Sequence, residues 1–390
     1  MLKNKKILLA VCGSIAFYKA FEILSLLKKQ GADVYVALSD GALEFCSVSG
    51  FEALSEHKIL SSQTQNWQDG VNHIAYSKMD LVLIAPASVN TINKLTAGIC
   101  DNVFMQTLIA ASHVPLVVAP AANNNMIEHF ATQNSLEILK KNGALVVEPV
   151  LKTLACGDVG KGALASPEVI VEAAIKRLSR PLFAGKKVVI TGGATTEKID
   201  DVRAITNFSS GKMARALARA FYYAGAEVKL LASFETANEP FDSLKFSSSS
   251  ELLELCKSEC EGANLLVMCA AVSDFVPTKI DGKIKKEDVG ESLNLDLKRN
   301  VDILQSLKEF KCKKIGFKLE ISSESALKSA RSMLEKKGLD AVCLNILGEK
   351  NGFASEQNEV NFITKNSEIL LPLASKDEIA GRIVELAANL

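Results

Sequence analysis

Short apolar runs alternate with amphipathic segments along the whole chain. Residues 5–11 (KKILLAV) and 186–191 (KKVVIT) are apolar runs that end beside glycine. Each is followed by a segment of helical periodicity and then by a second apolar run, at 33–39 (DVYVALS) and 227–233 (EVKLLAS). Continuous apolar runs are typical of strands buried on both faces of a parallel sheet. The pattern therefore predicts that both halves begin with a strand, a helix and a strand.

Further apolar runs predict that both sheets continue, at 81–88, 115–122, 144–149, 265–273, 314–320 and 340–345. Because these runs alternate with helical segments, we expect an α/β fold of two Rossmann-like or flavodoxin-like three-layer domains with mostly parallel sheets. A helix over 167–178 leads into SRPLFAG, whose Pro181 and Gly185 suit a linker, so we expect domains at 1–180 and 181–390. The similar starts of the halves fit either a duplication or two nucleotide-binding-type domains that begin alike, and we favour the second.

The composition indicates two cores and a small-molecule partner. With 390 residues, 48% of them hydrophobic, the chain is too long for one ordinary core. The 45 basic and 45 acidic residues balance, and aromatic residues make up only 6%, so neither a basic stripe nor a stacking platform argues for nucleic acid. The nine cysteines include no CxxC pair and most lie in apolar runs, which indicates reduced structural thiols and a cytoplasmic protein.

The first residues imitate a signal peptide, because a charged segment (MLKNKK) precedes an apolar one (ILLAVCGSIAF). The apolar run is short, contains Gly13 and Ser14, and continues into the predicted strand, helix and strand. No run approaches the roughly 20 apolar residues of a membrane span. We therefore expect neither a signal peptide nor contact with a membrane.

Polar residues follow the predicted strands of the first half. Ligands bind at the carboxyl ends of strands in open parallel sheets. At these ends the chain places residues 13–16 (GSIA), Ser39, 86–90 (PASVN) and 120–126 (PAANNNM). A Gly-Ser turn offers N–H groups and a hydroxyl to a phosphate, and the same turn also serves as a plain helix cap. Burying three consecutive amide side chains after a strand costs free energy unless they form hydrogen bonds.

Five ordered motifs of the first half resemble the FMN-dependent cysteine decarboxylase family. They are CGSIA (12–16), NHI (72–74), APASVNTINKLTAGICDN (85–102), PAANNNM (120–126) and ACGDVGKG (155–162). The resemblance implies that FMN oxidises the substrate thiol to a thioaldehyde, that CO₂ is lost, and that the enethiol is protonated and reduced by the reduced flavin. The FMN site that it implies comprises Gly13, Ser14, Ile15, Ala16, Ser39, Ser88 and Asn90.

The resemblance implies a function for the asparagines of residues 120–126. The family motif PxMNxxM places Asn123 and Met126 on the substrate, with Asn123 as the catalytic amide that binds the substrate carboxylate. We expect its NH₂ to donate to the anion while its carbonyl accepts from a neighbouring backbone N–H. Ala122 replaces the usual methionine of the motif. Asn124 and Asn125 occupy free positions, which we interpret as a helix N-cap.

Two further catalytic residues follow from the resemblance. His73 is implied to act as the base at the flavin, although its own sequence context also fits an ordinary surface histidine. Cys156 is implied to be the acid that protonates the enethiol. The family signature ACGxxGxGRM departs here at three positions, which hold Lys161, Ala163 and Leu164. Lys161 is a cation that can stand in for a lost substrate contact.

The second half places SSGKM (209–213) at the start of an amphipathic helix. Its N–H groups and the positive end of the helix dipole can face a phosphate, or the segment is only a helix cap. Together with AAVSDF (270–275), KIKK (283–286), GFKLE (316–320) and KGLDAVCLN (337–345), it resembles the phosphopantothenate–cysteine ligase family. By itself, KIKK is also typical of a solvated charge run.

The ligase resemblance implies that a carboxylate of 4′-phosphopantothenate attacks the α-phosphate of CTP, after which L-cysteine displaces CMP from the acyl cytidylate. Lys283, with Asp274 as the ligand of Mg²⁺, is implied to neutralise the leaving pyrophosphate. Asn207 is implied to hold the acyl nucleotide, and Arg203 to contact the substrate. The implied CTP-binding residues are Gly192, Ser209, Ser210, Gly211, Ala271, Asp274, Lys283, Lys285, Phe317, Lys337 and Asn345.

The two resemblances together imply coenzyme A biosynthesis, because the product of the ligase is the substrate of the decarboxylase. We expect a homo-oligomer with trimeric decarboxylase contacts and dimeric ligase contacts, such as a dodecamer. The alternative is a non-catalytic FMN-binding regulatory subunit, which the retention of His73, Asn123 and Cys156 disfavours. An NAD-dependent dehydrogenase is disfavoured because GxGxxG follows neither first strand.

Overall fold

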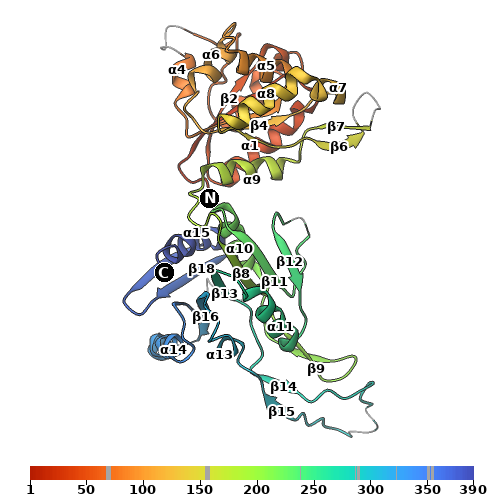
Figure 1. Cartoon of the computed structure of the whole chain (residues 1–390), viewed down its shortest axis with the longest axis vertical. Helices are drawn as coiled ribbons and strands as arrows, with labels where there is room; N and C mark the ends of the chain where they lie inside the picture. The colour runs from red at the N-terminus through yellow and green to blue at the C-terminus, as the bar shows by residue number, and fades with distance from the viewer. Residues whose placement is uncertain are drawn as a thin grey trace. The chain divides into compact units, whose positions relative to one another are not determined.

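The structure is a computed structural model that describes residues 1–66, 72–153, 159–237, 239–285, 287, 290–321, 323–348, 352 and 355–390. The chain divides into two compact units, Met1–Ser179 and Arg180–Leu390 (Figure 1). Each unit has its own sheet and its own buried apolar residues.

The first unit is built on a five-stranded parallel sheet. Its strands are β1 (Lys6–Val11), β2 (Asp33–Leu38), β3 (Leu81–Ala87), β4 (Leu116–Pro120) and β5 (Leu145–Val146). The order β2-β1-β3-β4-β5 is that of flavodoxin-like doubly wound folds. Ile7 lies opposite Leu81, and Val82 opposite Leu116. Every residue of β3 is buried, because helices cover both faces of the sheet.

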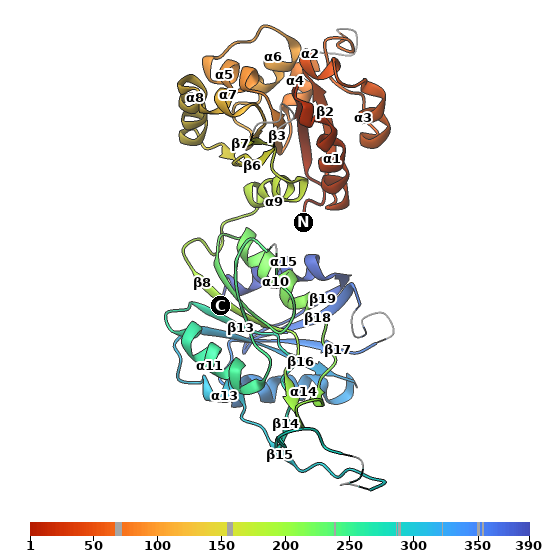
Figure 2. The same cartoon turned by 90° about the vertical axis from the view of Figure 1, so that its right-hand side faces the viewer.

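The helices of this unit are η1 (Ile15–Tyr18), α1 (Lys19–Lys29), α2 (Asp40–Leu43), α3 (Val48–Ser55), α4 (Asn72–Ser77), α5 (Val89–Ala97), α6 (Val103–Ala110), α7 (Asn124–Glu128), α8 (Phe130–Lys141) and α9 (Pro167–Leu178). Helix α1 packs against α3 and α9 on one face of the sheet, and α5 packs against α6 and α8 on the other (Figure 2). Ser88 begins α5 by accepting a hydrogen bond from the N–H of Thr91 at 3.3 Å.

An antiparallel hairpin lies outside the main sheet of the first unit. It consists of β6 (Val150–Thr153) and β7 (Val159–Ala163), and its connecting residues 154–158 lie outside the described residues. The N–H of Ala122, after β4, donates to the carbonyl of Gly162 at 3.1 Å. A Cβ added at Gly162 would lie 2.1 Å from the carbonyl oxygen of Ala122. Glycine therefore allows the hairpin to touch the loop that follows β4.

The second unit is built on an eight-stranded sheet. Its strands are β8 (Lys187–Gly192), β11 (Glu227–Ala232), β12 (Asp242–Lys245), β13 (Leu265–Met268), β16 (Lys313–Glu320), β17 (Ala341–Ile346), β18 (Gln357–Ile363) and β19 (Glu368–Ser375). The strand order is β12-β11-β8-β13-β16-β17-β18-β19. The six parallel strands, counted along the chain, have the Rossmann order 3-2-1-4-5-6. Strands β18 and β19 extend the sheet as an antiparallel edge.

Helices cover both faces of this sheet as well. They are α10 (Lys212–Tyr223), α11 (Ser249–Cys260), α13 (Ile303–Ser306), α14 (Ser323–Lys336) and α15 (Lys376–Ala387). Helices α10 and α15 pack together over one core, whereas α11, α13 and α14 cover a second core on the opposite face. Two small hairpins lie outside the sheet, β9 (Thr196–Lys198) with β10 (Ala204–Thr206) and β14 (Phe275–Pro277) with β15 (Leu297–Arg299).

The structure confirms the predicted fold class. Each further strand predicted from an apolar run is present, although β5 has only two residues. The antiparallel pairs were absent from the prediction, namely β6–β7, β9–β10, β14–β15 and β18–β19. The two sheets differ in strand order although both halves begin with the same pattern.

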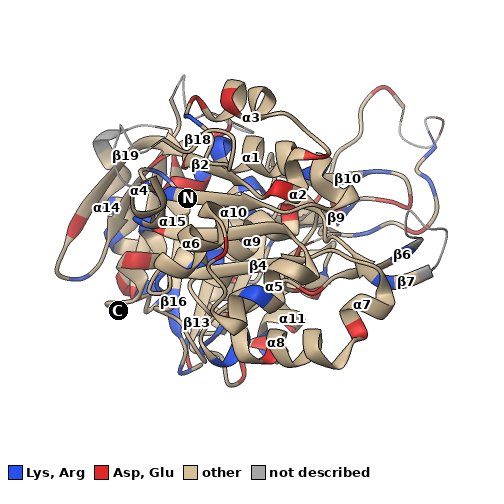
Figure 3. Ribbon diagram, turned by 90° about the horizontal axis from the view of Figure 1, so that it is seen from above, with Lys and Arg blue, Asp and Glu red and all other residues tan. Residues whose placement is uncertain are grey.

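The cysteines and the charged residues are spread over both units. The eight cysteines among the described residues are free, and five of them are buried. Basic and acidic residues are interspersed in the view of Figure 3. None of the helices in the described part of the chain has the length and apolar character that crossing a bilayer requires.

We predict that Gly162→Ala destabilises the first unit. The new methyl group would collide with the Ala122 carbonyl, and overpacking of this kind costs about 1 to 3 kcal/mol. Denaturant unfolding followed by far-UV circular dichroism measures the change in the free energy of unfolding. Gly381→Ala is the control, because a Cβ at this position in α15 meets nothing within 4 Å. Equal stability of the two variants would contradict the contact.

Candidate active sites

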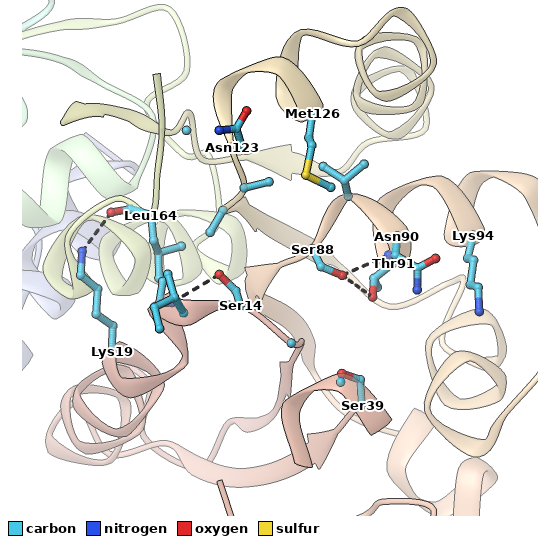
Figure 4. Close-up of a pocket in the computed structure, with 18 of the residues that line it drawn as sticks. Ser14, Lys19, Ser39, Ser88, Asn90, Thr91, Lys94, Asn123, Met126 and Leu164 are labelled. Carbon is cyan, nitrogen blue, oxygen red and sulfur yellow. Dashed lines mark hydrogen bonds between the residues drawn. The ribbon is translucent and has the colours of Figure 1, made fainter. Parts of the chain in front are cut away.

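The first unit has a cavity of about 970 Å³ at the carboxyl ends of its strands. It lies where β1, β2, β3 and β4 lead into η1, α2, α5 and α7 (Figure 4). All seven residues predicted for FMN line it, and so do Asn123 and Met126. The cavity therefore gathers motifs that are far apart in the sequence.

Three serines in this cavity also cap helices. The Oγ atoms of Ser14, Ser39 and Ser88 accept hydrogen bonds from backbone N–H groups at the starts of η1, α2 and α5, at distances of 3.2 to 3.3 Å. The helix-cap interpretation of these serines is therefore confirmed. Their hydroxyls also line the cavity, where the Oγ of Ser88 donates to Oγ1 of Thr91 at 3.2 Å. Gly13 allows the end of β1 to approach α2, since an added Cβ would lie 2.6 Å from the carbonyl carbon of Gly41.

The side-chain carbonyl of Asn123 accepts a hydrogen bond from a neighbouring backbone N–H, as predicted. Its Oδ1 accepts a hydrogen bond from the N–H of Asn125 at 2.9 Å, so that Asn123 is itself the N-cap of α7. The prediction that Asn124 and Asn125 form the N-cap is therefore wrong. Asn124 instead accepts a hydrogen bond from the N–H of Lys161 at 2.9 Å and thereby holds the hairpin β6–β7.

Two predicted catalytic residues are not among those that line the cavity. His73 lies half-buried on α4, outside the lining. Cys156 lies outside the described residues. Lys161, considered as a replacement cation, is exposed and also lies outside the lining, whereas Ala163 and Leu164 line it.

Three lysines that were not predicted from the sequence also line this cavity, namely Lys19, Lys94 and Lys152. Lys19 lies at the start of α1, and its Nζ donates to the carbonyl of Leu164 at 3.0 Å. Burial lowers the pKa of the Lys19 ammonium, and the nearby Lys152 lowers it further. Lys94 also lines the cavity and forms an ion pair with Asp101. The only signal in the sequence was the position of Lys19 and Lys152 next to recognised motifs.

The second unit has two adjoining cavities at the carboxyl ends of its parallel strands, of about 1260 and 210 Å³. Both are lined by Phe208, Ala270, Ala271, Phe317, Lys318 and Leu319. Of the predicted residues, the larger cavity also contains Asn207, Asp274 and Lys337. The smaller cavity also contains Ser209, Ser210, Gly211 and Asn345. The structure thus brings most of the predicted ligase residues to one edge of the sheet.

Local contacts orient several of these residues. The Nδ2 of Asn207 donates to the carbonyl of Val272 at 3.2 Å, and the Nζ of Lys337 lies 2.8 Å from Oδ2 of Asp302. Gly211 begins α10 with a φ of 71°, and a Cβ there would lie 2.1 Å from the ring of Phe234. Glycine is therefore required where the SSG segment turns into the helix.

Four predicted residues lie outside the lining of both cavities. These are Gly192, Arg203, Lys283 and Lys285. At Gly192 an added Cβ would lie 2.3 Å from the Cβ of Ala214, so this glycine brings β8 close to α10. Lys283 and Lys285 lie on the long connection between β14 and β15.

Arg203 helps to anchor that connection. Its Nη1 lies 2.6 Å from Oδ2 of the buried Asp200, and it also donates to the carbonyl of Ile284. The N–H of Ile284 donates to Oδ2 of Asp200 at 3.1 Å. Burial alone would raise the pKa of Asp200, but hydrogen bonds from the N–H groups of Val202, Ile284 and Arg203 hold it below its usual value. The base of the KIKK segment is thus fixed by an ionised aspartate.

The predicted metal ligand does not form a metal centre with protein groups alone. Asp274 lines the larger cavity and is exposed. Among the described residues, no three His, Cys, Asp or Glu side chains are arranged to hold a metal ion. A Mg²⁺ ion that is bound together with a nucleotide takes most of its ligands from phosphates and water, so a single carboxylate such as Asp274 is compatible with that role.

Known proteins match both units. Residues 1–179 match the family model described as flavoprotein, and residues 183–390 match the one described as DNA/pantothenate metabolism flavoprotein C-terminal domain. Relatives from Bacillus subtilis and Vibrio cholerae, both named coenzyme A biosynthesis bifunctional protein CoaBC, are 37% and 35% identical to this chain. The matches cover 100% and 99% of this chain and 98% of each relative. This chain belongs to that family. The resemblance seen in the motifs is therefore confirmed.

Two solved structures each match about half of this chain. The C-terminal domain of a coenzyme A biosynthesis bifunctional protein CoaBC is 30% identical with a TM-score of 0.45, and the match covers 54% of this chain and 97% of that chain. A PPC decarboxylase mutant complexed with pantothenoylaminoethenethiol is 30% identical with a TM-score of 0.39, and the match covers 44% of this chain and 97% of that chain.

We predict that Asp200→Asn releases the segment that carries Lys283. The neutral amide loses the charge that holds Arg203 and the N–H of Ile284, so hydrogen–deuterium exchange at residues 279–285 should become at least about tenfold faster. In the parent protein the same release should occur only as the pH falls below the ordinary aspartate range, because the folded-state pKa is lowered. Asp281→Asn, at an exposed position on the same segment, is the control. Unchanged exchange in Asp200→Asn would refute the anchor.

Proposed function

We propose that the chain ligates cysteine to 4′-phosphopantothenate with CTP and then decarboxylates the phosphopantothenoylcysteine with FMN. The observation that carries the decarboxylase proposal is the single cavity that gathers all seven predicted FMN residues with Asn123 and Met126. The family already places the chain in coenzyme A biosynthesis as a bifunctional protein. The free thiols favour a cytoplasmic location.

The first cavity fits FMN in size and chemistry. A volume of about 970 Å³ is at the upper end of ligand pockets. The hydroxyls of Ser14 and Ser39 can donate to a phosphate, whereas that of Ser88 donates to Thr91. Ile15, Met126 and Phe104 supply apolar contacts for a ring system. Bound FMN would supply the two-electron chemistry that makes the carbon–carbon bond of the substrate breakable.

The protein residues of this site orient the substrate and move protons. Asn123 binds the substrate carboxylate through its NH₂, because the backbone N–H of Asn125 fixes the orientation of the amide. Its neutrality matters, since a carboxylate there would repel the substrate. We assign the base to His73 and the acid to Cys156, as the family motifs imply.

The ligase site forms at the two adjoining cavities of the second unit. Asn207, held against Val272, orients the acyl cytidylate for attack by the cysteine amine. The backbone N–H groups of the SSG segment at the start of α10 bind phosphate oxygens. Lys283 acts on the leaving pyrophosphate, and Asp274 would hold Mg²⁺ together with the phosphates of CTP, where the ion would neutralise their charge.

We propose that neighbouring subunits complete both sites. His73 and Lys283 lie outside the cavities of their own units, although both are assigned to catalysis. Ile15 and Tyr18 lie side by side on η1 at the first cavity and expose 60% and 59% of their surface, which fits a face that a partner subunit covers. Trimeric contacts of the first unit and dimeric contacts of the second would supply those partners.

Mixed oligomers test the decarboxylase site. His73→Asn and Asn123→Asp should each lower CO₂ release at least about 100-fold, because one removes the base and the other places a carboxylate beside the substrate. When the two variants are unfolded and refolded together, part of the activity should return, since some sites then combine an intact His73 with an intact Asn123. Each variant refolded alone is the control. Full activity of either variant would refute its assigned role, and absence of complementation would refute the shared site.

The two steps of the ligase should separate in two variants. Lys283→Gln should form little acyl cytidylate, because an ammonium no longer follows the charge onto pyrophosphate. Asn207→Asp should form it but fail to pass it to cysteine, because a carboxylate repels its phosphate. Labelled CTP and 4′-phosphopantothenate are mixed with each variant, first without and then with cysteine. Lys279→Gln, on the same connection, is the control. Normal accumulation in Lys283→Gln would leave KIKK as a solvated charge run.

A further inference from the structure

The cavity of the first unit carries an excess of positive charge. Its lining includes Lys19, Lys94 and Lys152 against a single acid, Asp40. Lys94 is neutralised by Asp101. Among the described residues, neither Lys19 nor Lys152 forms an ion pair. Two ammonium groups without an ion-pair partner among the described residues thus line the same cavity.

The fold brings these two groups to the part of the cavity that the hairpin β6–β7 borders. Lys19 is held at the start of α1, where its Nζ donates to the carbonyl of Leu164, just after β7. Lys152 lies on β6, opposite Gly160 of β7. Of the charged groups near Lys19, Lys152 acts on its pKa more strongly than Glu22 or Glu168, and it acts in the opposite direction. Like charges this close repel, so the pair is stabilised when an anion binds between them.

The two ends of the cavity differ in their donors. Figure 4 shows Ser39, Ser88, Asn90 and Thr91 on one side, and Lys19 with Leu164 on the other. The first side offers the neutral groups of Ser39, Ser88 and Asn90, which are three of the seven residues proposed for FMN, together with Lys94, whose charge is paired with Asp101. The lysine side adjoins Ser14 and offers full positive charge, which a second anion can use. Two ammonium groups match the two negative charges of a phosphate monoester better than the one charge of a carboxylate.

We propose that Lys152 and Lys19 form a subsite for a phosphate monoester, and that they bind the 4′-phosphate of the phosphopantothenoyl substrate. This inference rests on the proposed decarboxylase function. Lys152 is the specificity-determining residue of the pair, and Lys19 is positioned by Leu164. Lys161, which precedes Gly162 on the same hairpin, is exposed outside the lining and does not contribute. The phosphate would fix β6, the strand that leads into the segment carrying Cys156.

The test compares two substrates in the full-length protein. CO₂ release is measured with phosphopantothenoylcysteine and with its dephosphorylated form, pantothenoylcysteine. Lys152→Gln should raise KM for the phosphorylated substrate about 10- to 100-fold, the range expected for a lost hydrogen bond to a charged group, and leave KM for the dephosphorylated one unchanged. Lys161→Gln, a matched change on the neighbouring strand, should leave both values unchanged. Lys19→Gln should shift the two values in the same way as Lys152→Gln.

Flavin binding separates the two sources of phosphate. FMN and riboflavin are titrated into the apoprotein of each variant, and flavin fluorescence gives the dissociation constants. We expect Lys152→Gln to bind both flavins as the parent does. Weaker FMN binding with unchanged riboflavin binding would assign the subsite to the cofactor and overturn the assignment to the substrate. Equal KM values for Lys152→Gln and Lys161→Gln in an active enzyme would overturn the subsite alone, whereas no CO₂ from the parent protein would overturn the proposed function.

Discussion

The parallel register of β1, β3 and β4 is the constraint on which the first site depends. A strand advances about 3.3 Å per residue, so a slip of two residues would move one strand end by about 7 Å. A slip of one residue would turn its buried side chains to the opposite face. Because both faces of the sheet are covered, apolar packing fixes the register. The core, rather than the loops, therefore brings Ser14, Ser88 and Asn123 within reach of one ligand.

The same buried strands explain how much of the molecule can be predicted from its sequence. Continuous apolar runs identify strands buried on both faces, and the residues after them must meet at one edge. This rule suffices for Ser39, Ser88 and Asn123. It fails for the hairpin β6–β7, because VLKT and VGKGA are short, each contains a lysine, and the second contains two glycines. Lys152 belongs to no motif, and only its position across from β7 brings it to the cavity.

The remaining errors of the sequence-based prediction concern which asparagine caps α7 and where His73 and Lys283 lie. Each residue of an amide run can cap a helix, and the sequence does not say which one does. Asn123 caps α7, so that Asn124 is left to bond the hairpin. For His73 and Lys283, the motifs select a candidate residue but do not predict whether it lines a cavity. Its position depends on segments that lie outside the sheets. The two units use different strand orders and still gather their candidate residues at the same kind of edge.

The hydrogen bond from the backbone N–H of Lys161 to Asn124 joins the loop after β4 to the hairpin β6–β7, although the two are far apart in the sequence. They can therefore be exchanged between related proteins only together. The loop after β4 and the hairpin also meet through Ala122 and Gly162, where no side chain fits between them. A chimera that takes the hairpin from a relative must therefore take residues 120–126 from the same parent. Amino-acid substitutions in one stretch must likewise be accompanied by compensating substitutions in the other. We therefore expect the two stretches to vary together among relatives.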